Sequence, residues 1–340
     1  MSELVKVVVD AMGGDNAPEQ VVKGAVEALK ESDKVFVYLV GREDAVNAEL
    51  EKYTYDKERV EVVNATEVIE MAEAPVNAIR SKKDSSIVKG MTMVRNGEAD
   101  AFVSAGSTGA VLVGGQVLIG RIKGVERPPL APLIPVDNER GCSLLIDCGA
   151  NVDARPSNLV QFAKMGSIYM ESVMCVKNPT VGIVNNGAEE EKGNALVKET
   201  FPLLKACPDI NFVGSVEARD IPAGTVDVIV CEAFVGNVVL KTFEGVGQTL
   251  IRKIKRGMMS NMRSKIGAML VKPALKETLK TFDLEQYGGA PMLGLKGLVV
   301  KTHGSSMSGE IKNSILQCLT FKEQKINEKI KEKIQGKDEQ

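Results

Sequence analysis

The sequence predicts an α/β protein with three layers, α/β/α, built on a mainly parallel mixed sheet. Two patterns lead to this class: short β-branched apolar segments alternate with longer segments of helical period, and glycine-rich turns follow many of the apolar segments. A third observation predicts that the sheet also contains an antiparallel pair of strands. The apolar segments 130–136 and 142–147 are joined by a short polar turn and therefore predict a hairpin.

The first strand is predicted over residues 4–10, where valines give the continuous apolar run of a strand covered on both faces. Asp10 stands at its carboxyl end, where open α/β sheets bind ligands. The Gly13–Gly14 pair permits a tight turn and the close approach of a ligand, and Asp15 or Asn16 is expected to cap the next helix. A helix start beside two glycines predicts a phosphate site, with an ordinary connecting loop as the equal alternative.

The rest of the chain repeats strand and helix. Further strands are predicted over 34–41, 59–64, 100–104, 180–185, 210–214, 226–232 and 297–302. Helices are predicted over 18–30, 43–53, 86–96, 108–120, 157–173, 191–205 and 237–265. These elements are expected to form a single large α/β domain over residues 1–325, either undivided or split into two lobes around a central crevice. Residues 326–340 are expected to form a polar tail.

One segment, about 245–276, contains basic residues but no acidic ones and is expected to project as an amphipathic helix. Its apolar stripe includes Ile251, Ile254, Met258 and Met262, and its basic face includes Arg252, Lys253, Lys255 and Arg256. A basic amphipathic helix is typical of contact with anionic lipid or with an acidic carrier protein. The alternative is a surface helix that packs on its own domain.

The composition argues against several classes of function. A net charge of −2 and a pI near 5.8 give no reason to expect nucleic-acid binding. The cysteines form no Cys-x-x-Cys pair and the chain has one histidine, so no metal site and no cofactor are predicted. The cysteines are expected to be free thiols in a reducing cytoplasm, and no apolar run is long enough to span a membrane.

Polar and glycine-rich turns follow the predicted strands and are expected to meet in one crevice lined by backbone donors. Their polar and glycine residues are Ser104, Ser107, Thr108, Gly109, Asn151, Lys192, Asn194, Asn237 and His303. Lys192 stands in a glycine-bounded segment, where a lysine can neutralise a phosphate or an oxyanion, with a solvated surface lysine as the alternative. His303 is assigned a structural or binding role rather than a catalytic one.

Seven groups of residues carry a family resemblance: Asp10-Ala-Met-Gly-Gly-Asp-Asn-Ala-Pro18, Ser104-Ala-Gly-Ser-Thr-Gly-Ala110, Arg127-Pro128, Asp147-Cys-Gly-Ala-Asn151, Glu191-Lys-Gly-Asn194, Phe234-Val-Gly-Asn237 with Leu240-Lys-Thr242, and His303-Gly-Ser-Ser306. In this order, over residues 4–320, they resemble the bacterial phosphate acyltransferase (PlsX) family. The resemblance implies a fold similar to that of phosphate acetyltransferases and of isocitrate and isopropylmalate dehydrogenases.

The resemblance also implies an activity: formation of acyl phosphate from inorganic phosphate and acyl-[acyl carrier protein], with release of the carrier protein, in phospholipid synthesis. It points to Lys192 and Asn237 as the catalytic pair. Substrate and phosphate are expected among Asp10, Gly13, Gly14, Asp15, Ser104, Ser107, Thr108, Gly109, Asn151, Asn194 and His303. A homodimer is implied, cytoplasmic and peripheral at an anionic membrane surface, with the membrane glycerol-3-phosphate acyltransferase as a further candidate partner.

Three positions depart from the family pattern, which usually has Asn at Ser107, Asp-Gly at Glu232-Ala233 and Ile-Gly around Asn186-Gly187. These departures bear on substrate preference and rate more than on reaction type. The alternative enzyme is a phosphate acetyl- or butyryltransferase that uses acyl-CoA. A metal- and nicotinamide-dependent dehydrogenase would need a carboxylate trio that the sequence does not offer, and a membrane adaptor without catalysis would not need the aligned ligand turns.

Overall fold

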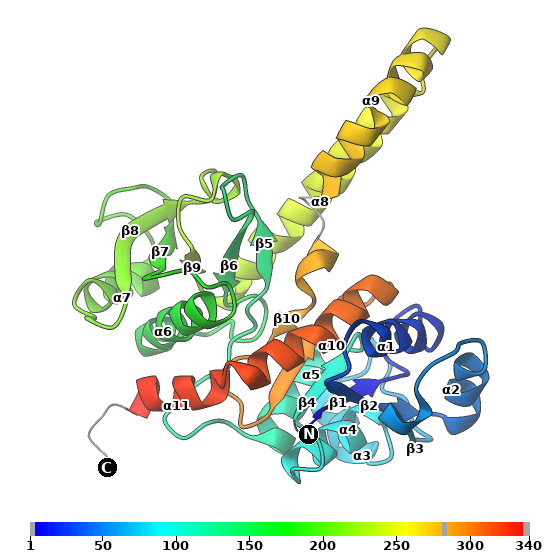
Figure 1. Cartoon of the computed structure of the whole chain (residues 1–340). Helices are drawn as coiled ribbons and strands as arrows, with labels where there is room; N and C mark the ends of the chain where they lie inside the picture. Colours follow the sequence, from blue (N-terminus) through cyan, green and yellow to red (C-terminus); the bar gives the residue numbers. More distant parts are fainter. Residues whose placement is uncertain (1–3, 281–283, 336–340) are drawn as a thin grey trace.

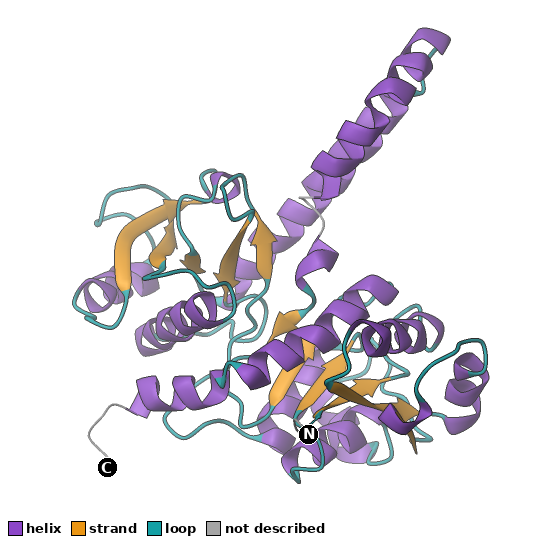
Figure 2. Ribbon diagram, viewed as in Figure 1, coloured by secondary structure: helices purple, strands orange, loops and turns teal. Residues whose placement is uncertain are grey.

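The computed structural model describes residues 4–280 and 284–335, which form two α/β lobes with a sheet in each (Figure 1, Figure 2). Helices cover both faces of each sheet. The predicted three-layer α/β/α class is therefore confirmed, with two mainly parallel sheets in place of one.

The first lobe is built from both ends of the chain. Its strands are β1 (Val5–Asp10), β2 (Val35–Gly41), β3 (Val60–Asn64), β4 (Ala101–Ser104), β10 (Ala290–Pro291) and β11 (Leu298–Lys301). Its helices are α1 (Glu19–Glu31), α2 (Glu43–Leu50), α3 (Pro75–Ser81), α4 (Ser86–Arg95), α5 (Thr108–Gly114) and α10 (Ser308–Glu323), with short helical turns η1 (Lys57–Arg59), η2 (Gly115–Ile119) and η4 (Leu284–Tyr287).

The sheet of this lobe has the order β10-β11-β4-β1-β2-β3, and β10 alone is antiparallel to its neighbour. α1 and α10 lie on one face, and α3, α4 and α5 lie on the other. The predicted strands are confirmed, whereas the two-residue β10, α3 and α10 were not predicted. Because β11 pairs with β4, the last strand of the chain lies in the interior of the sheet.

The second lobe comes from the middle of the chain. Its strands are β5 (Leu133–Pro135), β6 (Cys142–Ile146), β7 (Thr180–Asn185), β8 (Asn211–Glu217) and β9 (Val228–Val230), in the order β5-β6-β9-β7-β8. Antiparallel pairing of β5 with β6 confirms the predicted hairpin. On one face lie α6 (Pro156–Ser172) and α7 (Ala195–Lys205), and on the other lie η3 (Ile221–Ala223) and the start of α8 (Ala233–Met258).

The C-terminal residues correct one prediction. Residues 326–335 are not a polar tail but form helix α11 (Ile326–Gln335), which follows α10 of the first lobe and packs against α6 of the second. Ile326 and Ile330, one turn apart, are both buried in a core that runs through both lobes. Two isoleucines in a lysine- and glutamate-rich segment therefore suffice for docking, and residues 336–340 lie outside the described part.

The projecting segment is a hairpin of two helices, α8 and α9 (Met262–Lys280), rather than one helix (Figure 1). The chain reverses at Met259–Asn261, where the Asn261 side chain accepts a hydrogen bond from the Ser264 N–H (2.9 Å) and so caps α9. The expected apolar stripe is divided: Ile251, Ile254 and Met258 lie on α8, and Met262 begins α9. The described helices include none that is long and apolar enough to cross a bilayer.

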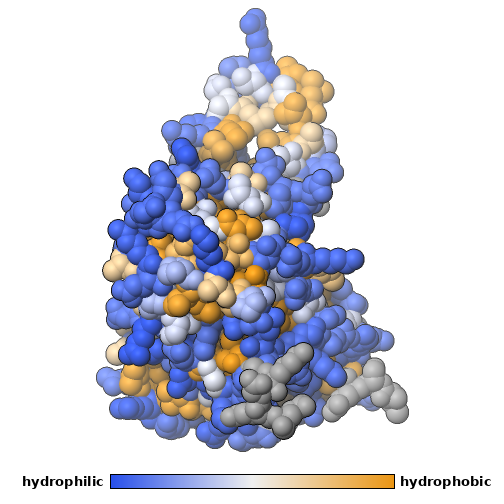
Figure 3. Space-filling model, turned by 90° about the vertical axis from the view of Figure 1, so that its left-hand side faces the viewer, coloured by the Kyte–Doolittle hydropathy of each residue, from blue (hydrophilic) through white to orange (hydrophobic). Residues whose placement is uncertain are grey.

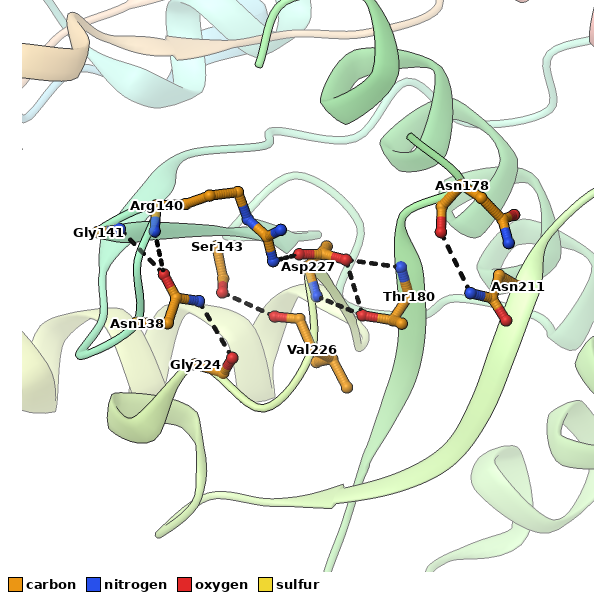
Figure 4. A network of polar contacts seen from close by, with 10 residues as sticks. All are labelled: Asn138, Arg140, Gly141, Ser143, Asn178, Thr180, Asn211, Gly224, Val226 and Asp227. Atoms are coloured by element: carbon orange, nitrogen blue, oxygen red, sulfur yellow. Dashed lines mark hydrogen bonds and ion pairs between the residues drawn. The ribbon is translucent and has the colours of Figure 1, made fainter. Parts of the chain in front are cut away.

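A polar network at the amino ends of β7 and β9 holds the second lobe together (Figure 4). The buried Asp227 carboxylate accepts hydrogen bonds from the Thr180 N–H (2.7 Å) and hydroxyl (2.8 Å), and it forms an ion pair with Arg140. Asn138 closes the β5–β6 turn through its bonds to the N–H groups of Arg140 and Gly141. This network lies at the end of the sheet opposite the carboxyl ends of the strands.

Candidate active site

The polar turns of the first lobe meet at the carboxyl ends of β1, β4 and β11. The hydroxyl of Ser104 donates to the Asp10 carboxylate (2.7 Å) and accepts from the Gly106 N–H (2.9 Å). The Met12 N–H donates to the other oxygen of Asp10 (3.2 Å). Gly13 has to be glycine here, because a Cβ would clash with Asp10 and with the Gly106 nitrogen. Two of the predicted glycine turns are therefore in direct contact.

The turn that follows β11 joins them. The Asp15 N–H donates to the Gly304 carbonyl oxygen (2.7 Å), and the Asn16 amide donates to the carbonyl oxygen of Ser305 (3.1 Å). Neither side chain caps α1, so that prediction is wrong: both residues serve this contact between turns instead. His303 is exposed, and its Nδ1 lies 2.8 Å from the Ser305 hydroxyl.

In the turn before α5, two of the predicted phosphate ligands have structural roles. Ser107 is buried, and its hydroxyl caps α5 by accepting from the Ala110 N–H (3.4 Å). Gly109 packs against the ring of Pro75, where a Cβ would not fit. Thr108, in contrast, is exposed at the first turn of the helix. An anion at this helix start would find the free N–H groups and the Thr108 hydroxyl.

In the second lobe the central group is Asp147, which directly follows β6. Its fully buried carboxylate accepts from the N–H groups of Leu130 (2.9 Å), Ala150 (3.3 Å) and Asn151 (2.8 Å), and from the Asn151 side-chain amide (2.7 Å). Burial raises the pKa of Asp147 to about 6, against the opposing effect of these bonds. The Asn151 amide also donates to the Pro128 carbonyl oxygen (3.0 Å), so this predicted ligand is engaged within the protein.

The loop that carries Lys192 is anchored at the end of β7. The buried Asn185 side chain accepts from the Asn186 N–H (2.8 Å) and donates to the Ser215 hydroxyl (3.0 Å). Asn194 caps α7 through the Val197 N–H (2.9 Å). Lys192 itself is exposed, and its ammonium group is not among the ion pairs of the described residues.

The first turn of α8 closes this part of the site. Glu232 caps the helix by accepting from the N–H groups of Phe234 (2.6 Å) and Val235 (3.0 Å), which explains how a glutamate is accommodated at this departure from the family pattern. Gly236 lies directly on the Asp147 carbonyl oxygen, where a Cβ would clash. One residue later, Asn237 is exposed and its side-chain oxygen faces Gly149.

A pocket of about 530 Å³ lies between these loops. Its walls include Asn185, Asn186, Gly193, Asn194, Glu232 and Val235. Lys192 and Asn237 do not line the pocket themselves: Lys192 directly precedes the lining residue Gly193, and Asn237 lies two residues after the lining residue Val235. The predicted phosphate residues of the first lobe form a separate group around Asp10, which the structure does not bring into this pocket.

Three polar residues of the site were not predicted: Asp147, Asn185 and Lys301. Each stands at the carboxyl end of a correctly predicted strand, so strand position could have identified them. In the part of the chain described, no group of three or more His, Cys, Asp or Glu side chains is placed to hold a metal ion.

Comparison with known proteins assigns the family. A model of the family described as "Fatty acid synthesis protein" matches residues 5–329. The chain is 53% identical over 333 residues to the phosphate acyltransferase of Clostridium novyi, which covers 98% of this chain and 99% of that protein. It is 50% identical over 329 residues to the phosphate acyltransferase of Clostridium acetobutylicum, covering 97% and 98%. The chain belongs to the phosphate acyltransferase family.

Solved structures show the same fold for the acyltransferase. A phosphotransacetylase from Streptococcus pyogenes superposes with a TM-score of 0.61 at 16% identity, covering 95% of each chain. The EutD phosphotransacetylase from Staphylococcus aureus gives 0.59 at 17% identity, covering 93% of this chain and 94% of that one. At these identities the likeness concerns the fold alone.

Proposed function

We propose that the acyltransferase forms acyl phosphate from acyl-[acyl carrier protein] and inorganic phosphate, and releases the carrier protein with a free thiol. The observation that carries the proposal is the pocket between the Lys192 loop and the start of α8. The exposed ammonium group of Lys192 and the exposed amide of Asn237 adjoin its lining segments in the sequence, after the carboxyl ends of β7 and β9. Both groups suit the anions of this reaction.

The chemistry needs little acid or base from the protein. A phosphate oxygen attacks the thioester carbonyl carbon, a carbon–oxygen bond forms, and the carbon–sulfur bond then breaks to release the thiolate. Phosphate is already anionic and the thiolate is a good leaving group. The protein therefore has to position the two partners and stabilise the tetrahedral oxyanion. Lys192 would neutralise this oxyanion or the phosphate, and Asn237 would donate a hydrogen bond to one of them.

The phosphate would enter from the first lobe. The start of α5, at residues 107–109, leaves backbone N–H groups without a partner in the helix, and such groups bind anions well. This helix start follows β4, at the carboxyl end of the sheet where β1 and its glycine turn also end.

The helical hairpin suits the remaining partners. A groove of about 1130 Å³ runs between it and the second lobe, with walls that include Val246, Leu250, Ile251, Ile254, Leu275 and Leu279. We assign this groove to the second copy in a homodimer, because an apolar face of this size is normally covered. Around the turn, Met262, Met269 and Leu270 are 71–79% exposed, and we assign this tip to an anionic membrane. Figure 3 shows apolar side chains on the hairpin, at the top of the molecule.

The basic residues beside the tip would serve the same surface. Arg252, Lys253, Lys255 and Arg256 are exposed on α8 and would attract anionic lipid or the acidic carrier protein. Acyl phosphate would then be released at the cytoplasmic face of the membrane. A membrane glycerol-3-phosphate acyltransferase is the partner that would consume it there.

Replacement of Lys192 tests the proposal. We expect Lys192→Ala to lower phosphate-dependent thiol release from palmitoyl-[acyl carrier protein] by roughly 10²- to 10³-fold, the usual effect of losing one group that stabilises an oxyanion. The matched control is Lys198→Ala, which removes another exposed lysine nearby on α7 and should leave the rate unchanged. Near wild-type turnover in Lys192→Ala would refute the catalytic assignment.

The acyl donor is tested in the same assay. Palmitoyl-[acyl carrier protein], palmitoyl-CoA and acetyl-CoA are compared with and without phosphate. Release that requires both phosphate and the carrier substrate supports the proposal. Release from CoA substrates alone would make the protein a phosphate acetyl- or butyryltransferase.

A further inference from the structure

The pocket of about 530 Å³ beside the Lys192 loop has walls that are mostly apolar. Their apolar side chains come from α6, β7, α7 and α8 and are Leu159, Ile183, Val184, Leu196, Val197 and Val235. Some of these residues pack on the α6 and α7 face of the sheet and others on the α8 face, so the pocket passes over the carboxyl end of β7. Its volume and its lining are those of a site for a small, largely apolar ligand.

The two helix starts at this pocket offer little to an anion. Asn194 caps α7 by accepting from the Val197 N–H (2.9 Å), and Glu232 caps α8 by accepting from the N–H groups of Phe234 and Val235. The donors that would attract phosphate to a helix start are therefore already engaged within the protein. The Glu232 carboxylate also lines the pocket, and its negative charge repels phosphate. An aliphatic group needs no hydrogen-bond partner here.

The two residues to which the proposed function assigns catalysis adjoin these walls. Lys192 directly precedes the lining residue Gly193, and a Cβ on Gly193 would clash with the Val197 side chain, so the Lys192 loop rests on an apolar wall. On α8, Asn237 lies two residues after the lining residue Val235. An acyl group whose thioester carbon lies near Lys192 and Asn237 can therefore extend its chain into the pocket.

We propose that this pocket binds the aliphatic chain of the acyl donor, and that Leu196 on α7 helps to set the chain length that the enzyme prefers. The inference rests on the proposed function and adds a subsite to it. Each methylene that leaves water for an apolar wall strengthens binding about fourfold, so the pocket favours fatty acyl donors over acetyl donors. Leu196 is partly exposed in the first turn of α7, where a larger side chain can fill the pocket without displacing the core.

A chain-length series tests the subsite. Butyryl-, octanoyl-, dodecanoyl- and palmitoyl-[acyl carrier protein] are compared by kcat/KM at saturating phosphate. For the wild-type enzyme we expect kcat/KM to rise about fourfold for each methylene until the chain fills the pocket. In Leu196→Trp the indole ring takes the place of part of the chain. The kcat/KM for the palmitoyl donor should then fall about sixteenfold, the effect of two displaced methylenes, and the value for the butyryl donor should not change.

A control and a second variant accompany Leu196→Trp. The matched control is Leu203→Trp, because Leu203 lies on the same helix, is 48% exposed and is not among the described residues that line the pocket. It should keep the wild-type chain-length profile. Ala218→Phe changes an exposed lining residue in the turn after β8 and should also lower kcat/KM for the palmitoyl donor, so the test does not depend on the folding of one variant. The KM for phosphate should not change in any of the three.

Binding of dodecanoate, measured by calorimetry, gives a readout that does not require turnover. We expect Leu196→Trp to raise the Kd for dodecanoate by the same factor and Leu203→Trp to leave it unchanged. Equal losses of kcat/KM for the butyryl and palmitoyl donors in Leu196→Trp, or a wild-type chain-length profile in that variant, would overturn the inference. Dodecanoate binding that Leu196→Trp weakens, without phosphate-dependent thiol release by the wild-type enzyme from any donor, would instead overturn the proposed function.

Discussion

At the scale of single residues, Asp147 shows how the site is held in shape. Four N–H donors converge on its buried carboxylate and fix the loop that faces Asn237. Because these donors occupy the carboxylate, we do not expect Asp147 to contact the substrate directly. Its contribution to the site is to hold the backbone of residues 147–151 under the start of α8.

The raised pKa of Asp147 predicts a pH-dependent stability. Its value of about 6 in the folded protein lies above the ordinary 3.8, so the folded state binds the proton more tightly than the unfolded state. The free energy of unfolding should therefore fall by about 2 kcal/mol as the pH rises from 4 to 6. Asp147→Asn removes this titration, so the stability of wild type minus variant should decline over that window in denaturant unfolding. A difference that stays constant with pH would contradict the prediction.

The residue roles were predictable to different degrees. Gly13 and Ser104 were expected in the site because glycine and hydroxyl residues after a strand indicate a ligand turn. That the Ser107 hydroxyl caps a helix through Ala110 is a local pattern that the sequence could have indicated. The bond from the Asn151 amide to the Pro128 carbonyl oxygen joins residues 23 positions apart, and no local pattern contains that information.

At the scale of elements, the helical hairpin predicts two separable contacts. Met262→Glu at the exposed tip should lower cosedimentation with anionic vesicles about tenfold or more, because burial of a methionine side chain contributes about 2 kcal/mol. The same variant should keep the mass of the proposed dimer. Leu250→Glu, in the groove, should dissociate the proposed dimer at micromolar concentration, as seen by sedimentation velocity. Each variant is the control of the other. A Met262→Glu protein that still binds vesicles would refute the assignment of the tip to the membrane.

The hairpin also shows where periodicity stops being informative. Ile251 to Met262 keep a helical spacing across the turn, so the pattern alone predicted one helix. The break lies in Ser260 and Asn261, whose capping bonds stabilise a helix end and start. In the sequence alone, a Ser-Asn pair inside an apolar stripe only weakly indicates a break between two helices.

At the scale of the whole molecule, the network around Asp227 predicts a loss of stability without loss of chemistry. Asp227→Ala leaves the N–H of Thr180 without its acceptor and should lower the free energy of unfolding by about 2 kcal/mol. Since the network lies at the amino ends of the strands, turnover at 25 °C should not change. Asp220→Ala, which breaks an exposed contact with Arg219, is the control and should have little effect on urea unfolding. Lost turnover in a folded Asp227→Ala protein would contradict this separation.

The predicted strands and most of the predicted helices exist, because β-branched runs and helical spacing are local signals. Their division between two sheets was not predictable in the same way. Strand β11 completes the first sheet beside β4, across almost 200 residues of chain, and only long-range packing decides such a pairing. The packing of α11 through two isoleucines could likewise not be predicted from the composition of this segment.

The order in which this sheet is made has a consequence during synthesis. Until β11 emerges from the ribosome, β4 has no partner on one side and presents an open edge. The second lobe is encoded without interruption and can fold earlier as a unit. The nascent chain therefore holds an unfinished sheet for most of its translation, and catalytic competence arrives only with the last tenth or so of the polypeptide.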